Sequence, residues 1–191
     1  MRKVFIGGSR DVSRFNKVIQ NRLQGILDAG MSVFLGDANG ADKAAQRWFA
    51  ENGYPQVTVF HSGDSPRNNL GHWPTRRIVP KLKKKDFFYH AAKDLAMAES
   101  ADYGFMLWDG LSKGTLNNIL NLLERGKKVV VWFSPDRDCK TLRQVPDLMP
   151  LLAECPQEAM EEFEVKIDLS SRLAPVQTSL SLAYAINNKR S

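Results

Sequence analysis

Five short and almost continuously apolar runs recur along this chain, separated by segments with helical patterning. The runs are KVFIG near residue 5, SVFLG near residue 34, VTVF near residue 58, YGFMLW near residue 105 and KKVVVWF near residue 130. Each run is rich in β-branched or aromatic residues, which is typical of parallel strands covered on both faces. Strands of this kind at these intervals restrict the chain to a few layered α/β folds.

Four apolar stripes at helical spacing accompany these runs. Gly30, Gly53 and Gly126 each stand just past the last periodic residue of a stripe, where a helix is expected to end. Strand and helix therefore alternate, and we predict an α/β fold: a Rossmann-like three-layer sandwich with a mostly parallel sheet of about five or more strands. The stripes are Phe15, Ile19, Leu23, Ile26 and Leu27; Ala41, Ala44, Ala45, Trp48 and Phe49; Phe88, Ala91, Ala92, Leu95 and Ala98; and Leu116, Ile119, Leu120 and Leu123.

The length of 191 residues, 43% of them hydrophobic, suits one compact domain with its own core. We expect a single domain over residues 1–191, with a core over 1–135 and a C-terminal extension over 136–191 that is a candidate dimerisation element. In the extension, residues from about 145 to 163 are predicted as helix and FEVKIDL as a short edge strand. Residues 174–191 are interpreted as either a dimerisation arm or a disordered tail.

Several classes of protein are disfavoured by composition. No apolar run approaches the ~20 residues that a membrane span needs, and no signal-peptide core is present, so we expect a soluble cytoplasmic protein with no membrane partner. Cys139 and Cys155 cannot form a disulfide framework. Neither a CxxC pair nor HExxH occurs, so no metal and no cofactor are expected.

The long connection from Phe60 to about Lys85 holds most of the basicity of the chain. The formal net charge is +6, and seven basic residues with no acidic one lie between Arg67 and Lys85, so the remaining residues carry −1. Such a segment is solvated, folds over an anionic ligand as a lid, or binds nucleic acid with steep salt dependence. The seven are Arg67, Arg76, Arg77, Lys81, Lys83, Lys84 and Lys85.

Three loops rich in glycine follow predicted strands and should meet at one edge of the sheet. In open α/β sheets, ligands bind beyond the carboxyl ends of the strands. Glycine lets backbone approach a ligand closely, and the N–H groups of the next helix favour phosphate. Neither GxGxxG nor GxxxxGK[ST] is present, so an ordinary dehydrogenase or P-loop site is disfavoured. The loops are Gly7-Gly8-Ser9-Arg10, Gly36 to Asp42, and Trp108 to Thr115.

The ordered series VFIGGSRD, LGDANGADKAAQRW and AESADYGFMLWDGLSKGT resembles the SLOG superfamily of Rossmann-like proteins, most closely its YspA-like branch, over about residues 3 to 133. The resemblance implies a nucleotide-derived ligand in the cleft between these loops, and in some members a sensor of ADP-ribose-type signals in phage defence. Relatives include the lonely-guy phosphoribohydrolases, which cut the N-glycosidic bond of a nucleoside monophosphate, and DprA, which binds single-stranded DNA. A homodimer or higher homo-oligomer is expected by analogy.

The phosphoribohydrolases carry RKxxM on a helix and then PGGxGTxxE. The corresponding pieces here are Lys93 to Met97 and Gly114-Thr115-Leu116-Asn117-Asn118, so lysine replaces the arginine and Asn118 the glutamate. An amide cannot serve as a general base or stabilise an oxocarbenium ion by charge. We therefore expect a protein that senses or sequesters an adenosine or ADP-ribose type ligand; an N-glycosidase with a relocated carboxylate is the alternative, and nucleic-acid binding the third hypothesis.

Individual roles follow from residue chemistry within these loops. Arg10 and Lys93 are the cations best placed for phosphate, the first as a planar fork and the second as a point charge. Asp109 suits a ribose hydroxyl and is also the one weak catalytic candidate, whereas Asp42 opens a helix and would cap it or complement its dipole. The ligand-binding set is Gly7, Gly8, Ser9, Arg10, Gly36, Asp37, Asn39, Gly40, Ala41, Asp42, Lys93, Asp109, Gly110, Ser112, Gly114 and Thr115.

Some of these side chains have an equally plausible structural role. Ser112 and Thr115 are hydrogen-bond donors for a phosphate or ribose, but they also suit a helix cap. Asn39 either contacts the ligand or supports its turn. Trp73 could stack on a base, whereas a place in the core is expected for Trp108. The same default applies to the histidines, for which no catalytic partner is evident in the sequence.

Overall fold

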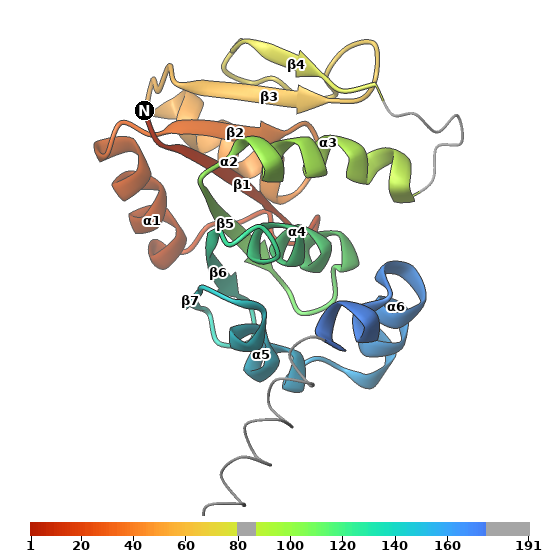
Figure 1. Ribbon diagram of the computed structural model, residues 1–191. Coiled ribbons are helices and arrows are strands. Elements are labelled where there is room, and N and C mark those ends of the chain that lie inside the picture. Colours follow the sequence, from red (N-terminus) through yellow and green to blue (C-terminus); the bar gives the residue numbers. More distant parts are fainter. Residues whose placement is uncertain (80–86, 175–191) are drawn as a thin grey trace, which may run out of the picture.

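The computed structural model describes residues 1–79 and 87–174, which form a seven-stranded sheet between layers of helices (Figure 1). The strand order is β4-β3-β2-β1-β5-β6-β7, and every pair is parallel except β6–β7. The predicted Rossmann-like α/β sandwich is thereby confirmed. The elements are β1 (Lys3–Gly8), α1 (Lys17–Asp28), β2 (Ser32–Gly36), α2 (Ala41–Glu51), β3 (Val57–His61), β4 (Thr75–Arg77), α3 (Phe87–Ser100), β5 (Tyr103–Trp108), α4 (Lys113–Leu123), β6 (Lys128–Phe133), β7 (Asp138–Leu142), the 3-10 turn η1 (Val145–Leu148), α5 (Met149–Ala153) and α6 (Gln157–Ile167).

The sheet separates two apolar clusters, one on each face. Val4 and Ile6 of β1 pack in the cluster of α1 and α2, whereas Phe5 packs in the cluster of α3, α4 and α6. Because successive residues of a strand point to opposite faces, one strand contributes to both layers. Figure 1 shows α3 and α4 together on one face of the sheet. The continuous apolar runs of the sequence are therefore those of strands buried on both sides.

The five apolar runs and four stripes correspond to β1, β2, β3, β5 and β6 and to α1 to α4. Gly30, Gly53 and Gly126 follow helices with φ of +60°, +60° and +68°, a conformation that glycine adopts without steric cost. Phe15 differs from expectation because it precedes the helix. Asn16 is the N-cap of α1, and its side chain accepts a hydrogen bond of 3.0 Å from the N–H of Ile19.

Two further strands were not predicted, and both lie at edges of the sheet. β4 has the sequence TRR with all three residues exposed, and it lies inside the long connection after Phe60. β7 has the sequence DCKTL and runs antiparallel to β6. Edge strands carry charged residues that protect their unpaired backbone groups, so their apolar signal is weak.

The predictions for the extension need two corrections. The single helix expected near 145–163 is three pieces, η1, α5 and α6, with a break before Pro156, which is the N-cap of α6. The strand expected for FEVKIDL is wrong, because α6 continues to Ile167. Ala159, Phe163 and Ile167 recur every four residues and are buried, while Val165 is 77% exposed, as a one-sided helix requires.

The extension packs on the face of the sheet that carries α4. The ring of Phe163 lies 6.1 Å from that of Trp108 at the end of β5. Arg172 binds three side chains of α4 and its C-cap: its guanidinium donates to Asn117 at 2.7 Å, to Asn121 at 3.0 Å and to Glu124 at 2.7 and 2.8 Å. The outer surface of α4 is therefore held by residues more than forty positions later in the chain. The dimerisation role expected for this extension stays a prediction.

Candidate functional site

A cleft of about 540 Å³ lies at the carboxyl ends of β1 and β5, where the order of the sheet reverses direction. Strands β2, β3 and β4 are added in turn on one side of β1. The chain then passes through α3 and adds β5 on the other side of β1. This reversal leaves the loops after β1 and β5 diverging to opposite faces, which is the general place for ligands in open α/β sheets. The lining residues include Phe5, Gly7, Gly8, Ser9, Arg10, Asp11, Ala38, Asp42, Arg67, Ala91, Lys93, Asp94, Asp109, Leu111, Ser112, Lys113, Gly114, Thr115, Asn117 and Asn118.

The loop after β1 is fixed by its backbone. The N–H of Ser9 donates to the carbonyl of Leu107 at 2.9 Å, and the carbonyl of Ser9 accepts from the N–H of Ala41 at 3.1 Å. A Cβ at Gly8 would overlap the Leu107 carbonyl oxygen and lie 2.9 Å from the Cβ of Ala41. Glycine is therefore required here for the close approach of β1, β5 and the start of α2.

Asp109 is held by donors from both loops. Its carboxylate accepts hydrogen bonds from the hydroxyl of Ser9, from the N–H of Leu111 at 2.9 Å and from the N–H of Ser112 at 2.8 Å. Ser112 in turn caps α4, since its hydroxyl accepts from the N–H of Thr115 at 3.3 Å and from the Thr115 hydroxyl at 3.0 Å. The carboxylate of Asp109 thus has a fixed orientation at the mouth of the cleft.

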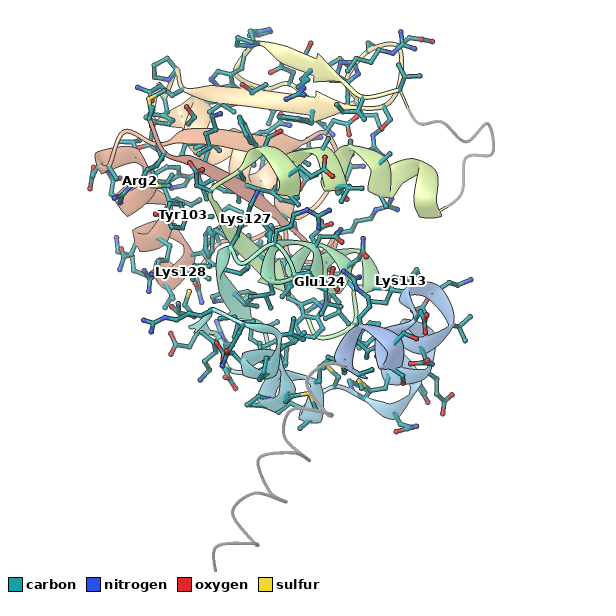
Figure 2. All side chains as sticks on the ribbon, in the orientation of Figure 1. Arg2, Tyr103, Lys113, Glu124, Lys127 and Lys128 are labelled. Carbon is teal, nitrogen blue, oxygen red and sulfur yellow. The ribbon has the colours of Figure 1, made fainter. Side chains whose placement is uncertain are left out.

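Arg10 is exposed and lines the cleft, and its side chain has no ion pair or hydrogen bond among residues 1–79 and 87–174. Two other cations of the lining are already bound: Lys113, which Figure 2 labels, pairs with Glu162 of α6, and Arg67 pairs with Asp37. The N–H groups of Lys113 and Gly114 precede the first internal hydrogen bond of α4, so they are free to meet an anion. The mouth of the cleft therefore offers a guanidinium and a helix N-terminus.

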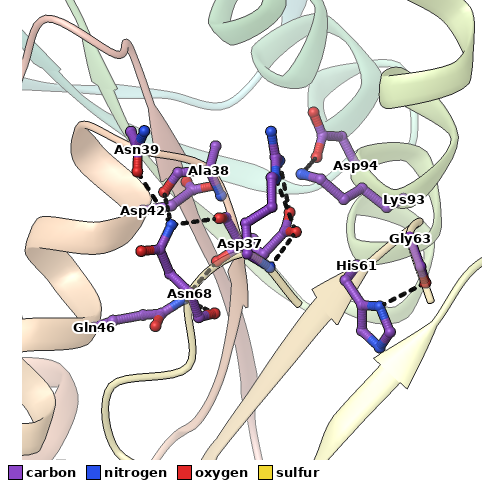
Figure 3. A network of polar contacts seen from close by, with 12 residues as sticks. Asp37, Ala38, Asn39, Asp42, Gln46, His61, Gly63, Asn68, Lys93 and Asp94 are labelled. Carbon is purple, nitrogen blue, oxygen red and sulfur yellow. Dashed lines mark hydrogen bonds and ion pairs between the residues drawn. The ribbon is translucent and has the colours of Figure 1, made fainter. Parts of the chain in front are cut away.

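The cleft is also lined by a charged group that we call the Lys93 cluster, made of the buried Asp42, Lys93 and Asn118 and the partly buried Asp94. Lys93 is 4% exposed, and its ammonium lies 2.6 Å from Asp94, as Figure 3 shows. A Cβ at Gly36 would overlap the Asp42 carboxylate and lie 2.9 Å from Lys93 Nζ, so both groups press against the end of β2. Lys93 lines the cleft as expected, but its charge is already bound to Asp94.

Burial and neighbouring charge act in opposite directions on this cluster. Burial raises the pKa of Asp42 to about 6; the positive charge of Lys93 opposes this rise, and the negative charge of Asp94 adds to it. Burial lowers the pKa of Lys93, but Asp94 and Asp42 outweigh it, so the pKa is raised overall. Lys93 therefore stays charged, and Asp42 takes up a proton close to neutral pH.

Among the buried polar side chains that line the cleft, Asn118 is the one with an unpartnered atom in the described part of the chain. It is 6% exposed, its Nδ2 donates to Asp94 at a long 3.5 Å, and its Oδ1 is buried with no hydrogen-bond partner in the described part of the chain. Most buried polar atoms in native proteins have a partner, and the exceptions gather at functional sites.

Asp37 lies outside the cleft, in a network that braces the loop after β2 (Figure 3). Its carboxylate accepts from the Arg67 N–H at 3.1 Å, from Nε at 3.0 Å and from the terminal nitrogen at 2.7 Å. Burial raises the pKa of Asp37, but the hydrogen bonds from Arg67, with added charge from Lys93, outweigh burial and leave it below its usual value. Asn68 donates to the Asp37 carbonyl at 2.8 Å and to Asn39 Oδ1 at 3.2 Å, so Asn39 supports this turn.

The predicted ligand-binding residues divide into two groups. Gly7, Gly8, Ser9, Arg10, Asp42, Lys93, Asp109, Ser112, Gly114 and Thr115 line the cleft. The others do not line it and lie in the turns beside it, at the end of β2 or at the start of α2: Gly36, Asp37, Asn39, Gly40, Ala41 and Gly110.

Several lining residues were missed. Asp94 is the most important of them, and its signal was the Lys93–Asp94 dipeptide within an otherwise apolar helical stripe. Arg67 was assigned to the basic segment, and nothing in the sequence indicated its pairing with Asp37 across thirty residues. Phe5 is both strand core and cleft floor.

Trp73, Trp108 and His61 lie in the core, whereas His72 is exposed. Trp73 is 8% exposed and donates from Nε1 to the carbonyl of Tyr54 at 2.8 Å, so it is not available to stack on a base. Trp108 is fully buried. His61 is also buried, with Nδ1 3.1 Å from the Gly63 carbonyl, and it does not line the cleft.

The basic segment is only partly described. Arg77 pairs with Asp64 at 2.7 Å, and the guanidinium of Arg76 lies 5.4 Å from the ring centroid of Phe60. Lys81, Lys83, Lys84 and Lys85, on which the nucleic-acid hypothesis mainly depends, lie outside the described residues. That hypothesis stays a prediction.

No protein-family model matches this chain, and no curated protein sequence matches it. Over residues 1–79 and 87–174, no group of histidine, cysteine and acidic side chains could hold a metal ion, and no helix is long and apolar enough to cross a membrane. Fold and site define the class: an α/β protein of Rossmann-like architecture with a polar cleft at the reversal point of its sheet.

Proposed function

We propose that this protein binds a nucleotide-derived small molecule, with the ligand phosphate at the mouth of the cleft. The observation that carries the proposal is Arg10, whose guanidinium has no partner among the described residues and which lines the same cleft as the first residues of α4, at the reversal point of the sheet. A planar guanidinium with a helix N-terminus is a strong combination for phosphate oxygens. The resemblance of the three loops to the SLOG superfamily supports the same ligand class, and we propose membership of that superfamily.

The arrangement of Asp109 supports a sugar next to the phosphate. Its carboxylate is oriented by Ser9, Leu111 and Ser112 and faces the same cleft as Arg10. A fixed carboxylate accepts hydrogen bonds from ribose hydroxyls, whereas a carboxylate already bound by three donors is a weak nucleophile. Binding therefore accounts for the geometry of Asp109 better than catalysis does.

A thermal-unfolding screen against nucleoside mono- and diphosphates, NAD and ADP-ribose tests the proposal. A ligand at ~100 times its dissociation constant should stabilise the folded state by ~2.7 kcal/mol. Arg10→Ala should abolish the shift, and Arg14→Ala, which removes an exposed arginine outside the cleft, should preserve it. The proposal fails if no phosphate compound raises the unfolding temperature, or if Arg10→Ala and the parent protein respond equally.

A second candidate function is cleavage of an N-glycosidic bond. It is favoured by one observation: Asp94 lines the cleft, and within residues 1–79 and 87–174 its Oδ2 has only the long contact to Asn118, so a carboxylate oxygen is available to a substrate. Incubation with nucleoside monophosphates and NAD, followed by chromatography for free base, tests this function. Turnover that is lost in Asp94→Asn or Asp109→Asn would replace the binding proposal with an enzymatic one.

A further inference from the structure

Asn118 differs from the neighbouring asparagines of α4. Asn117 and Asn121 each have an Oδ1 bound by Arg172, at 2.7 and 3.0 Å, so both have a structural partner. Asn118 faces the cleft, and its Oδ1 has no donor within the described residues. The helix thus contains satisfied asparagines where it packs on the extension and an unsatisfied one where it borders the ligand cleft.

The orientation of the Asn118 amide follows from its neighbour. An ionised carboxylate only accepts hydrogen bonds, so the amide turns its Nδ2 to Asp94 Oδ2, while Asp94 Oδ1 is taken by Lys93 at 2.6 Å. The raised pKa of Lys93 keeps this ammonium charged and in place. Two neighbouring residues of the lining thus each have an acceptor without a short hydrogen bond in the described part of the chain, Asn118 Oδ1 and Asp94 Oδ2.

We propose that Asn118 and Asp94 form a subsite for the amino-bearing edge of a nucleobase, of the adenine or cytosine class. This inference rests on the proposed function, because it assigns the base end of the same ligand. An exocyclic amino group has two hydrogens, one for Asp94 Oδ2 and one for Asn118 Oδ1, which the amide must turn toward the cleft to accept. A base with an oxo group at the same position would present an acceptor to these two acceptors, and its neighbouring ring N–H could pair with only one of them.

The spacing along α4 fits this assignment. Asn118 is five residues beyond Lys113, which places it about 7.5 Å along the helix axis from the phosphate-binding end. That separation leaves room for a sugar between phosphate and base, next to Asp109. Phe5 and Ala91 also line the cleft and supply apolar surface for the faces of a base ring.

The decisive experiment compares matched ligands that differ only in amino against oxo: adenosine with inosine 5′-monophosphate, and cytidine with uridine 5′-monophosphate. Calorimetric titration should give at least about a tenfold preference for the amino member of one pair. Asn118→Leu removes the amide at similar volume and should reduce that preference to less than about threefold. Asn121→Ser, on the same helix but outside the cleft lining, should keep it.

The outcomes separate this inference from the proposed function. Equal binding of the amino and oxo members of both pairs would overturn the nucleobase subsite and leave phosphate binding intact. If the parent protein prefers the amino ligands and Arg10→Ala binds none of the four, the phosphate site and the nucleobase subsite are both supported. If no phosphate ligand binds the parent protein, both are overturned. The comparison in the parent protein needs no variant, so it decides the question even if Asn118→Leu folds poorly.

Discussion

Asp37 and Asp42 lie five residues apart, at the two ends of one turn, and both are buried, yet they have opposite electrostatic surroundings. Asp37 accepts three hydrogen bonds from Arg67, its pKa is lowered, and it lies outside the cleft. Asp42 accepts one, from the N–H of Ala38 at 3.2 Å, its pKa is raised to about 6, and it lines the cleft. The carboxylate whose hydrogen bonds are complete, Asp37, supports the cleft from outside, and the one whose hydrogen bonds are incomplete, Asp42, lines it.

This contrast extends to whole groups of residues. The Asp37–Arg67 pair joins the loop after β2 to the chain after β3, and every polar atom of its carboxylate has a donor. The Lys93 cluster has two carboxyl groups for one ammonium and one amide with an unbound oxygen. A largely buried cluster with more hydrogen-bond acceptors than donors costs free energy on folding. Proteins tolerate this cost at sites where a ligand supplies the missing donors.

Removing the cation from the Lys93 cluster should have the largest effect. Lys93→Met leaves the buried carboxyl of Asp42 and the partly buried carboxyl of Asp94 without their positive partner, and we expect a loss of about 3–5 kcal/mol in the free energy of unfolding at pH 7.5. Urea unfolding measures it. The loss should shrink at pH 4.5, below the raised pKa of Asp42, where that carboxyl is protonated. Lys140→Met, at an exposed pair with Asp136, should change stability very little; equal losses in the two variants would refute the special status of Lys93.

Asp42→Asn should act in the opposite direction and stabilise the protein. The pKa of Asp42 is about 6 in the folded state against an ordinary 3.8, so the folded state holds a proton that the unfolded chain releases between these values. Stability therefore falls as pH rises through this window, by up to about 3 kcal/mol. The neutral amide removes that loss, so the variant should be more stable than the parent at pH 8 and equal to it near pH 4. Urea unfolding at the two pH values measures this, and a variant that is less stable at pH 8 would contradict it.

Asp37→Asn should destabilise, with the reverse pH dependence. Folding lowers the pKa of the Asp37 carboxyl. The ionised carboxylate therefore stabilises the folded protein at pH values above the pKa of the unfolded chain, and this stabilisation is lost as the pH falls through the pKa of the folded state. We expect urea unfolding to give a cost of about 1.5–3 kcal/mol at pH 7.5, since hydrogen bonds to a charged group are lost. Asp64→Asn breaks the exposed pair with Arg77 and is the matched control, with an expected cost below about 1 kcal/mol. Indistinguishable costs would show that the burial of Asp37 is unimportant.

The smallest effect is expected for Asn68→Ala. This change removes the neutral hydrogen bonds to the Asp37 carbonyl at 2.8 Å and to Asn39 Oδ1 at 3.2 Å and should cost about 1 kcal/mol of stability. Asn68 is not part of the cleft lining, so the dissociation constant of any ligand found in the screen should be unchanged. A variant with normal stability and weakened binding would place the Asp37 network in the site rather than beneath it.

The sequence predicted the layers well because the central strands are buried on both faces and their apolar runs have no other explanation. It failed where an element is short or polar. β4 and β7 are edge strands with exposed polar residues, and α6 was mistaken for a strand because FEVKIDL holds only two turns of its stripe.

The candidate site was predicted in outline but not in its electrostatics. Glycine loops and their following helices located the mouth of the cleft, including Arg10 and Asp109. Sequence alone could not show that Lys93 binds Asp94, or that Arg67 returns across thirty residues to bind Asp37. Such pairings depend on side-chain packing between helices and loops that are distant in the chain.

The attachment of Arg172 to α4 bears on how this protein should be handled. Asn117, one of the residues that Arg172 holds, also lines the ligand cleft. A chain truncated after β6 would keep all the loops of the cleft and lose the guanidinium that fixes its wall. Binding measured on such a minimal fragment would therefore underestimate the affinity of the longer chain, even though every proposed contact residue was present.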